Sequence, residues 1–141
     1  RAKEILTKLT TECCEYYYTQ LGDSSSEGQA AACSSIEDIF KNSDAKTKLA
    51  AFVPQFLESL LELVKDPKTE VSDRSFAALG MIVSEVPMDC APFAAAFIRV
   101  GFTSICFGND KPPDAAAVFL KSLYRTYKDL EKEIVQKMDT Y

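Results

Sequence analysis

The chain has 141 residues, of which 47% are hydrophobic and 26% charged, and 21 acidic against 16 basic side chains give a net charge of −5. These values predict one folded domain with a buried core and exclude a wholly disordered chain. The absence of histidine excludes Ser-His-Asp and Cys-His nucleophiles and histidine-ligated zinc or haem. The mild acidity argues against a protein that binds nucleic-acid phosphates without sequence preference.

The five cysteines are odd in number and form no C-x-x-C motif. We therefore expect neither a metal site nor a cofactor. Most of the cysteines lie within apolar helical patterns, which favours buried thiols in a reducing compartment, the cytoplasm or the nucleus, over a secreted protein. Whether any of them form disulfides stays open. The five are Cys13, Cys14, Cys33, Cys90 and Cys106.

Neither a signal peptide nor a membrane span is expected. No charged-then-apolar leader occupies the first 20 residues. The apolar stretch 93–107 is short for a bilayer and is interrupted by Arg99. The chain begins at Arg1 rather than Met, as a processed product or an excised piece of a longer chain would.

In chain order, apolar residues recur at helical rather than strand spacing, so the sequence predicts an all-α chain. We expect six helices, at about residues 2–21, 27–42, 46–65, 70–86, 91–107 and 112–138. Gly22, the Asp66-Pro67 step and the Pro112-Pro113 step separate helices, whereas Pro92 fits the first turn of one. Because the connections are short, consecutive helices should be antiparallel neighbours.

Three segments of the chain align when Asp23, Asp66 and Asp110 are superposed, at periods of 43 and 44 residues. Each Asp is expected to accept backbone N–H bonds in a turn, and an acid four residues later lies near the positive end of the next helix. Branched aliphatic residues follow at a shared offset of 13 (Ile36, Leu79 and Leu123). The shared period predicts three helical hairpins in a single domain, at about residues 1–42, 43–86 and 87–141.

The central unit resembles a HEAT repeat almost from end to end. Residues 52–64, which include Pro54, resemble the first helix, residues 66–71 resemble the turn, and residues 75–82 resemble the second helix. Only Arg74 approximates the Arg that pairs with the turn Asp in many HEAT units, so no continuous Asp–Arg ladder is expected.

The chain is therefore similar to the HEAT/armadillo superfamily and, within it, most similar to the importin-β (karyopherin) group. The resemblance implies three HEAT-like hairpins in a short right-handed α-solenoid. It also implies a non-catalytic protein–protein interaction scaffold, or a segment of a nuclear transport receptor, within a longer repeat array. Its partners would be proteins, such as cargo proteins or a Ran-type GTPase, and not nucleic acid.

The sixth expected helix carries a candidate partner-binding stripe. Lys121, Arg125 and Lys128 are spaced 4 and 3 residues apart, on one helical face, and Tyr124 lies beside them. A phosphate, an acidic peptide or an acidic protein surface could dock there. The alternative is an ordinary solvated face, neutralised through i,i+4 pairs by the acids that follow, Asp129, Glu131 and Glu133.

Other candidate contacts lie nearer the N-terminus. Glu37 and Asp38, with the acids of the first helix, could attract basic peptides or be ordinary surface acids. Tyr16 and Tyr17 belong to a run of three tyrosines that covers most of a helix circumference, so at least one should be exposed or covered by a preceding repeat. Met81 falls at a solvent-facing position of the repeat pattern and could be a soft contact.

Two other functional classes compete with the scaffold. A six-helix carrier of an apolar small molecule, secreted or cytosolic, could line its cavity with the apolar residues of the fifth helix, although such stripes are also ordinary core. An enzyme would need a carboxylate pair such as Glu37 and Asp38, or a thiolate at Cys13 or Cys14. Adjacent acids on a helix point in different directions and cannot flank one substrate atom, so no enzyme is expected. The candidate cavity residues are Phe93, Phe97, Ile98, Phe102, Ile105 and Phe107.

Overall fold

The structure is a computed structural model that describes residues 2–22, 25–41, 50–66, 68–107 and 114–139. Within these ranges every regular element is a helix and no strand occurs, which confirms the all-α prediction. Among the described residues, six helices have at least 11 residues. The elements are α1 (Ala2–Leu21), α2 (Ser26–Lys41), η2 (Ala50–Phe52), α4 (Val53–Leu63), α5 (Thr69–Glu85), α6 (Pro87–Cys90), η3 (Ala91–Phe93), α7 (Ala94–Phe107) and α8 (Asp114–Asp139).

Two helix starts differ from the sequence-based prediction by more than two residues, and both differ at prolines. α4 begins at Val53, so Pro54 lies in its first turn rather than in its interior, and residues 46–49 of the predicted helix lie outside the described ranges. The predicted fifth helix is preceded by the four-residue α6, which begins at Pro87, and by the 3-10 turn that contains Pro92. Proline lacks an N–H and clashes with a preceding helical turn, so each proline occupies the start of an element.

Hydrogen bonds stabilise the turn between α4 and α5, and one of them is made by Asp66 in the way that the repeat pattern predicts. An Asp66 carboxylate oxygen accepts the backbone N–H of Lys68 at 2.8 Å. The hydroxyl of Ser72, in the first turn of α5, donates to the carbonyl of Val64 at 2.8 Å. The other two aligned Asp residues, Asp23 and Asp110, lie outside the described residues, as does the predicted unit boundary at 42–43.

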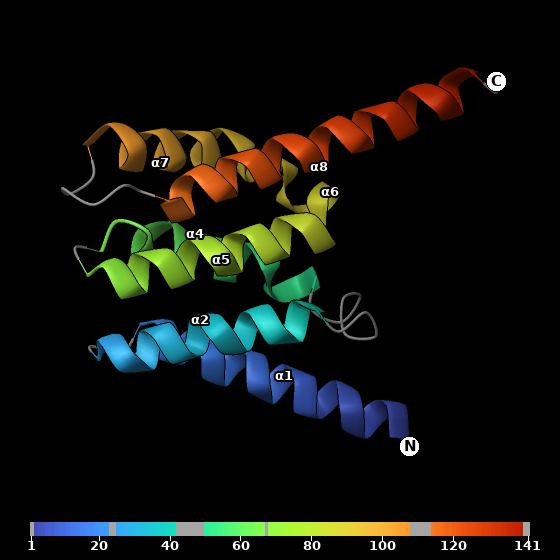
Figure 1. Ribbon diagram of the computed structural model, residues 1–141. Helices are drawn as coiled ribbons and strands as arrows, with labels where there is room; N and C mark the ends of the chain where they lie inside the picture. The colour runs from blue at the N-terminus through green and yellow to red at the C-terminus, as the bar shows by residue number, and fades with distance from the viewer. Residues whose placement is uncertain (1, 23–24, 42–49, 67, 108–113, 140–141) are drawn as a thin grey trace.

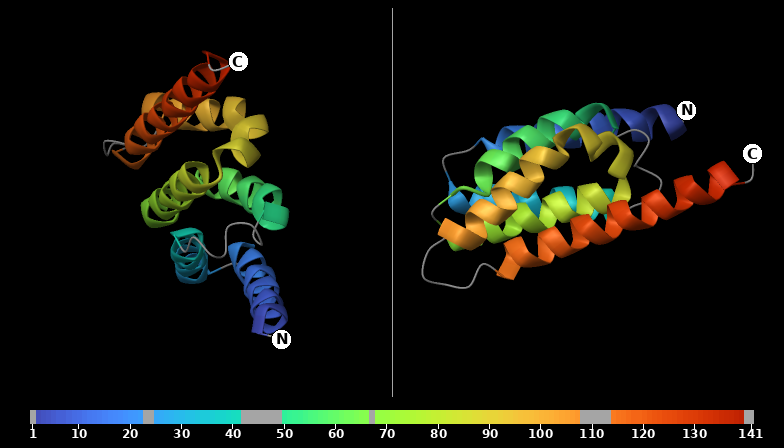
Figure 2. Two further views of the ribbon diagram at one scale, coloured as in Figure 1. Left: turned by 90° about the vertical axis from the view of Figure 1, so that its right-hand side faces the viewer. Right: turned by 90° about the horizontal axis from the view of Figure 1, so that it is seen from above.

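The helices form two layers (Figures 1 and 2). α2, α5 and α8 lie side by side in one layer and α1, α4 and α7 in the other, and α1 contacts α2, α4 contacts α5, and α7 contacts α8. α5 contacts α2 on one side and α8 on the other. The α1–α2 pair and the α7–α8 pair therefore form opposite ends of a stack whose middle is α4–α5.

Aromatic rings fill the interior between the layers. Phe40 of α2 meets Phe56 of α4 edge-on, with ring centroids 6.3 Å apart. Phe119 of α8 contacts Phe76 of α5 at 5.6 Å and Phe97 of α7 at 5.7 Å. These contacts join each pair of helices to the next, so the core is continuous along the stack.

Candidate functional site

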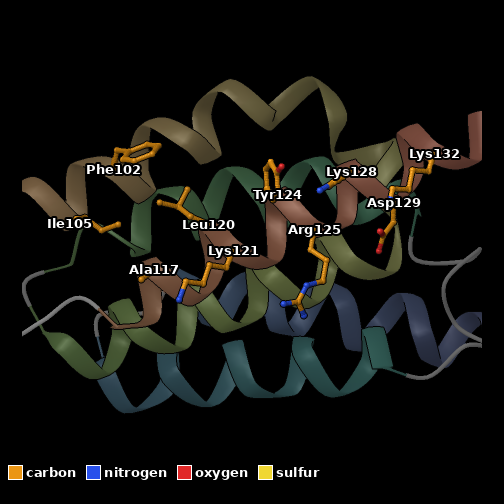
Figure 3. A pocket seen from close by; sticks show the side chains of 10 residues that line it. All are labelled: Phe102, Ile105, Ala117, Leu120, Lys121, Tyr124, Arg125, Lys128, Asp129 and Lys132. Carbon is orange, nitrogen blue, oxygen red and sulfur yellow. The ribbon is translucent and has the colours of Figure 1, made fainter. Parts of the chain in front are cut away.

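An open groove of about 760 Å³ runs between α7 and α8 at one end of the stack (Figure 3). The two helices meet closely at Gly101 of α7, where an added Cβ would lie only 2.6 Å from Cδ2 of Leu120. Beyond that contact α8, which has 26 residues against 14 in α7, continues past the rest of the stack (Figure 1). The groove is lined by Phe102, Ile105, Ala117, Leu120, Lys121, Tyr124, Arg125, Lys128, Asp129 and Lys132.

The apolar part of the groove is exposed to solvent. Tyr124 is 68%, Phe102 55% and Ile105 39% exposed, whereas Leu120 beneath them is partly buried. Large apolar side chains gathered in one place on a surface mark interaction sites more often than isolated ones do. This exposure is therefore what a docking surface would require.

Basic side chains border the groove on its α8 side. Lys121, Arg125 and Lys128, the predicted stripe, all line the groove, and Lys132 extends their spacing. The Lys128 ammonium lies 5.6 Å from the centroid of the Tyr124 ring, a cation–π distance. All four cations are exposed.

The neutralisation of these cations by neighbouring acids, which is the alternative that the sequence leaves open, does not occur among the described side chains. The ion pair formed by described side chains joins Lys65 to Glu62, far from the groove in sequence. Asp129 and Glu131, two of the acids proposed as i,i+4 partners, make no ion pair with the stripe within this part of the chain, and the Glu133 side chain lies outside it. The stripe thus presents positive charge to solvent.

Tyr127 fixes the position of α8 beside the groove. Its hydroxyl donates to the carbonyl oxygen of Pro87 at 2.9 Å and so ties α8 to α6. Burial, and secondarily the thiol of Cys90, raises the pKa of Tyr127 to about 12. The hydroxyl therefore remains a hydrogen-bond donor throughout the neutral range.

Replacement of Tyr127 by phenylalanine tests this tie. The folded-state pKa lies above the unfolded value of 10.0, so the stability that Tyr127 contributes is complete below pH 10 and is lost as the pH rises toward 12. We expect Tyr127→Phe to lower the free energy of unfolding by about 1 kcal/mol at pH 7 and to show a smaller alkaline loss than wild type. Urea midpoints measured from pH 7 to pH 11 give both quantities, and equal alkaline losses in the two proteins would contradict the assignment.

The other predicted contacts lie away from the groove. Tyr16 of α1 is 60% exposed and Tyr17 packs against the core, with their rings 5.8 Å apart, which confirms that the tyrosine run has an exposed member. Glu37 is half-buried and Asp38 exposed, both on α2. Met81 is partly buried rather than fully exposed, because α5 has neighbours on several sides and Met81 packs against the core.

Six groove residues were not among the predicted site residues: Phe102, Ile105, Ala117, Leu120, Asp129 and Lys132. Phe102 and Ile105 were assigned to the cavity of the alternative carrier, but the structure divides that set, because Phe97 is buried core while these two face the groove. The Phe107 side chain lies outside the described residues. Lys132 lies four residues after Lys128, and this continued spacing is the signal that could have found it.

The cysteines are free, and they divide into two classes. The prediction of buried thiols is right for Cys14, Cys33 and Cys90 and wrong for Cys13 and Cys106, which face outward from α1 and α7. Burial raises the pKa of all three buried thiols, to about 11 for Cys14 and about 12 for Cys90. Among the described residues no three Cys, Asp or Glu side chains are grouped so as to hold a metal ion.

Thiol titration of the native protein is expected to separate these classes. A disulfide reagent such as dithiobis-nitrobenzoate attacks thiolates that it can reach, so Cys13 and Cys106 should react rapidly in the folded protein. The three buried thiols should react only after denaturant is added. Rapid reaction of more than these two thiols without denaturant, in a protein whose circular dichroism is unchanged, would contradict the burial.

One described helical stretch, Pro87–Cys106, is long and apolar enough to cross a membrane by length and composition alone, at 20 residues, and 22% of its most apolar window is buried. Core helices of soluble proteins meet the same criterion. The stretch contains Asp89, Pro92 and Arg99 and changes from α to 3-10 to α geometry. The absence of a membrane span therefore stays a prediction.

A scan against protein-family models, a search of curated proteins and a search of solved structures each found no match.

Proposed function

We propose that the chain is a segment of a HEAT-type α-solenoid, in which three antiparallel hairpins stack in a right-handed superhelix, and that it acts as a non-catalytic protein–protein interaction scaffold in the cytoplasm or nucleus. The contacts α2–α5–α8 and α1–α4–α7 support it, because each hairpin of a solenoid touches its neighbours along the stack. The period of 43 to 44 residues supports it independently.

The groove between α7 and α8 is the observation that carries the interaction role. Aromatic side chains and arginine are enriched at protein interfaces, and tyrosine and arginine are frequent among the residues that dominate binding. Tyr124, Phe102 and Arg125 supply them on two rigid helices. The more specific version, a segment of a nuclear transport receptor that binds cargo or a Ran-type GTPase, rests on the HEAT resemblance of the central unit.

The groove favours a scaffold over the carrier of an apolar small molecule. A small-molecule site buries most of its ligand's surface, whereas this groove is open and its Tyr124 and Phe102 are more than half exposed. The rings that could have lined an internal cavity, Phe97 among them, are in contact with other rings of the core.

Site-specific photo-cross-linking in cell extract tests the proposal. A benzophenone amino acid replaces Tyr124 in the groove or, as a matched control, Glu58, which is exposed on α4. We expect discrete protein adducts from position 124 that position 58 does not give. Adducts lost when GTP-loaded Ran is added would support the receptor version, and adducts indifferent to it would support a scaffold. The absence of adducts at position 124, with lipid in the purified protein, would contradict the proposal and favour the carrier.

A further inference from the structure

We propose that the α7–α8 groove binds an amphipathic α-helix of a partner protein, one whose apolar stripe is flanked by acidic residues and whose acidic C-terminal end lies at Lys128 and Lys132. This inference rests on the proposed function and names the chemistry of the partner. It follows from the length of the groove, the arrangement of its apolar side chains and the sign of its charge.

The groove has the length and form of a helix-binding site. Its α8 wall extends from Ala117 to Lys132, which at 1.5 Å per residue is about 22 Å, or about four turns of a partner helix. Phe102 and Ile105 of α7 line the other side at the apolar end, so a partner would lie in a trough between two helices there and continue along α8 toward Lys132. Docking an apolar helix face into such a trough is a recurring mode of peptide recognition.

The groove is polar at one end and apolar at the other. Phe102, Ile105 and Leu120 lie toward one end, and Lys128 and Lys132 lie at the other, as Figure 3 shows. Tyr124 lies between them and points toward the space between the helices. A partner helix with large apolar side chains at i, i+4 and i+7 could place the first two on the phenylalanine and isoleucine and the third on the tyrosine.

The charge of the lining selects an acidic partner. Lys121, Arg125, Lys128 and Lys132 face a single acid of the lining, Asp129, in a chain whose net charge is −5. Acidic residues along the partner helix would pair with this row. Because a helix is negative at its C-terminal end, that end is favoured at the lysine-rich end of the groove.

Two other occupants fit the groove less well. An anionic membrane is flat, whereas the apolar residues of the groove lie between two helices. A second copy of the chain could offer the exposed stripe of α1, Ile5, Leu9 and Tyr16. That helix carries two lysines with its three glutamates, so its charge complements the groove only weakly. Both occupants are outcomes of the test below.

The first arm of the test measures charge preference. The probes are two synthetic helical peptides of about 15 residues with leucines at i, i+4 and i+7, one with glutamates and the other with lysines on the flanks and C-terminal end. By fluorescence anisotropy, the wild-type chain should bind the glutamate peptide at least tenfold more tightly, a difference of about 1.4 kcal/mol. Lys128→Glu/Lys132→Glu should reverse the preference. Lys41→Glu/Lys65→Glu, the same charge change at exposed lysines elsewhere, should not.

The second arm measures orientation. A nitroxide on the C-terminal end of the glutamate peptide should broaden the amide signals of residues 128–132, and one on the N-terminal end should broaden those of residues 102–105. The reverse pattern would overturn the orientation, and equal binding of the two peptides would overturn the charge selectivity.

Separate outcomes identify the other occupants. Binding to phosphatidylserine vesicles without binding to the peptide would assign the groove to a membrane. A concentration-dependent dimer, abolished by Leu9→Asp in α1, would assign it to a second copy. Adducts at position 124 in extract without peptide binding would leave the proposed function standing and overturn this inference alone. The absence of both the adducts and the peptide binding would overturn the proposed function and this inference together.

Discussion

Replacing Phe97 by alanine should lower the free energy of unfolding by about 3–5 kcal/mol. Phe97 is fully buried on α7, and its ring meets Phe119 of α8 edge-on at 5.7 Å and stacks on Phe93 at 6.3 Å. The substitution leaves a cavity and removes the ring contacts that join α7 to α8 and to Phe93 of the preceding turn. Urea denaturation followed by circular dichroism measures the loss.

Phe102→Ala is the matched control, because it is the same substitution five residues along the same helix. The Phe102 ring faces the groove, so its removal should change the free energy of unfolding by no more than about 0.5 kcal/mol. It should nevertheless weaken binding of the glutamate peptide, because the ring belongs to the apolar part of the groove. Equal destabilisation by the two substitutions would contradict the placement of α7.

These two phenylalanines show where the sequence was insufficient. The apolar pattern assigned both rings to one set, because α7 is apolar around most of its circumference and periodicity then fails to distinguish an inner from an outer face. Only the packing of α7 against α8 separates them. The groove depends on this separation, and it also requires the close approach at Gly101, which has no sequence signal of its own.

Local features of the fold could be predicted from the sequence better than the packing of one helix on another. The bounds of α1 and α5 follow from helical periodicity and from breakers such as Gly22 and Pro67, and the turn role of Asp66 follows from the repeat alignment. Local chemistry decides these features, so neighbouring residues suffice to predict them. The partial burial of Met81 could not be predicted, because it depends on which helices surround α5, and that is decided by contacts between residues about 40 positions apart.

The basic stripe of α8 could be predicted from the sequence only in part. Its spacing placed Lys121, Arg125 and Lys128 on one face of α8, and in the structure all three border one groove, which the sequence did not predict. The sequence left open whether neighbouring acids neutralise them, because an i,i+4 pair forms only when both side chains point the same way. In the described part of α8 they do not pair, and the aromatic residues opposite come from another helix.

Gly101→Ala and Gly80→Ala should change stability in opposite directions. At Gly101 an added Cβ would lie 2.6 Å from Cδ2 and 2.7 Å from Cγ of Leu120. The Cγ atom is close to the backbone, so rotation of the methyl groups alone does not relieve the clash, and α7 must move away from α8. We expect Gly101→Ala to lower the free energy of unfolding by about 1–3 kcal/mol, even though alanine is the better helix former.

At Gly80, by contrast, an added Cβ would be 3.8 Å from Cδ1 of Phe119, an ordinary contact. The gain in helix propensity should then stabilise the protein by about 0.5–1 kcal/mol. Combining Gly101→Ala with Leu120→Ala should cost at least about 0.5 kcal/mol less than the sum of the single substitutions, because the two side chains compete for one space. Additive losses, or a stabilising Gly101→Ala, would show that α7 and α8 do not meet at Gly101 and Leu120. The groove would then lose the geometry on which peptide docking depends, because its two walls would lie further apart.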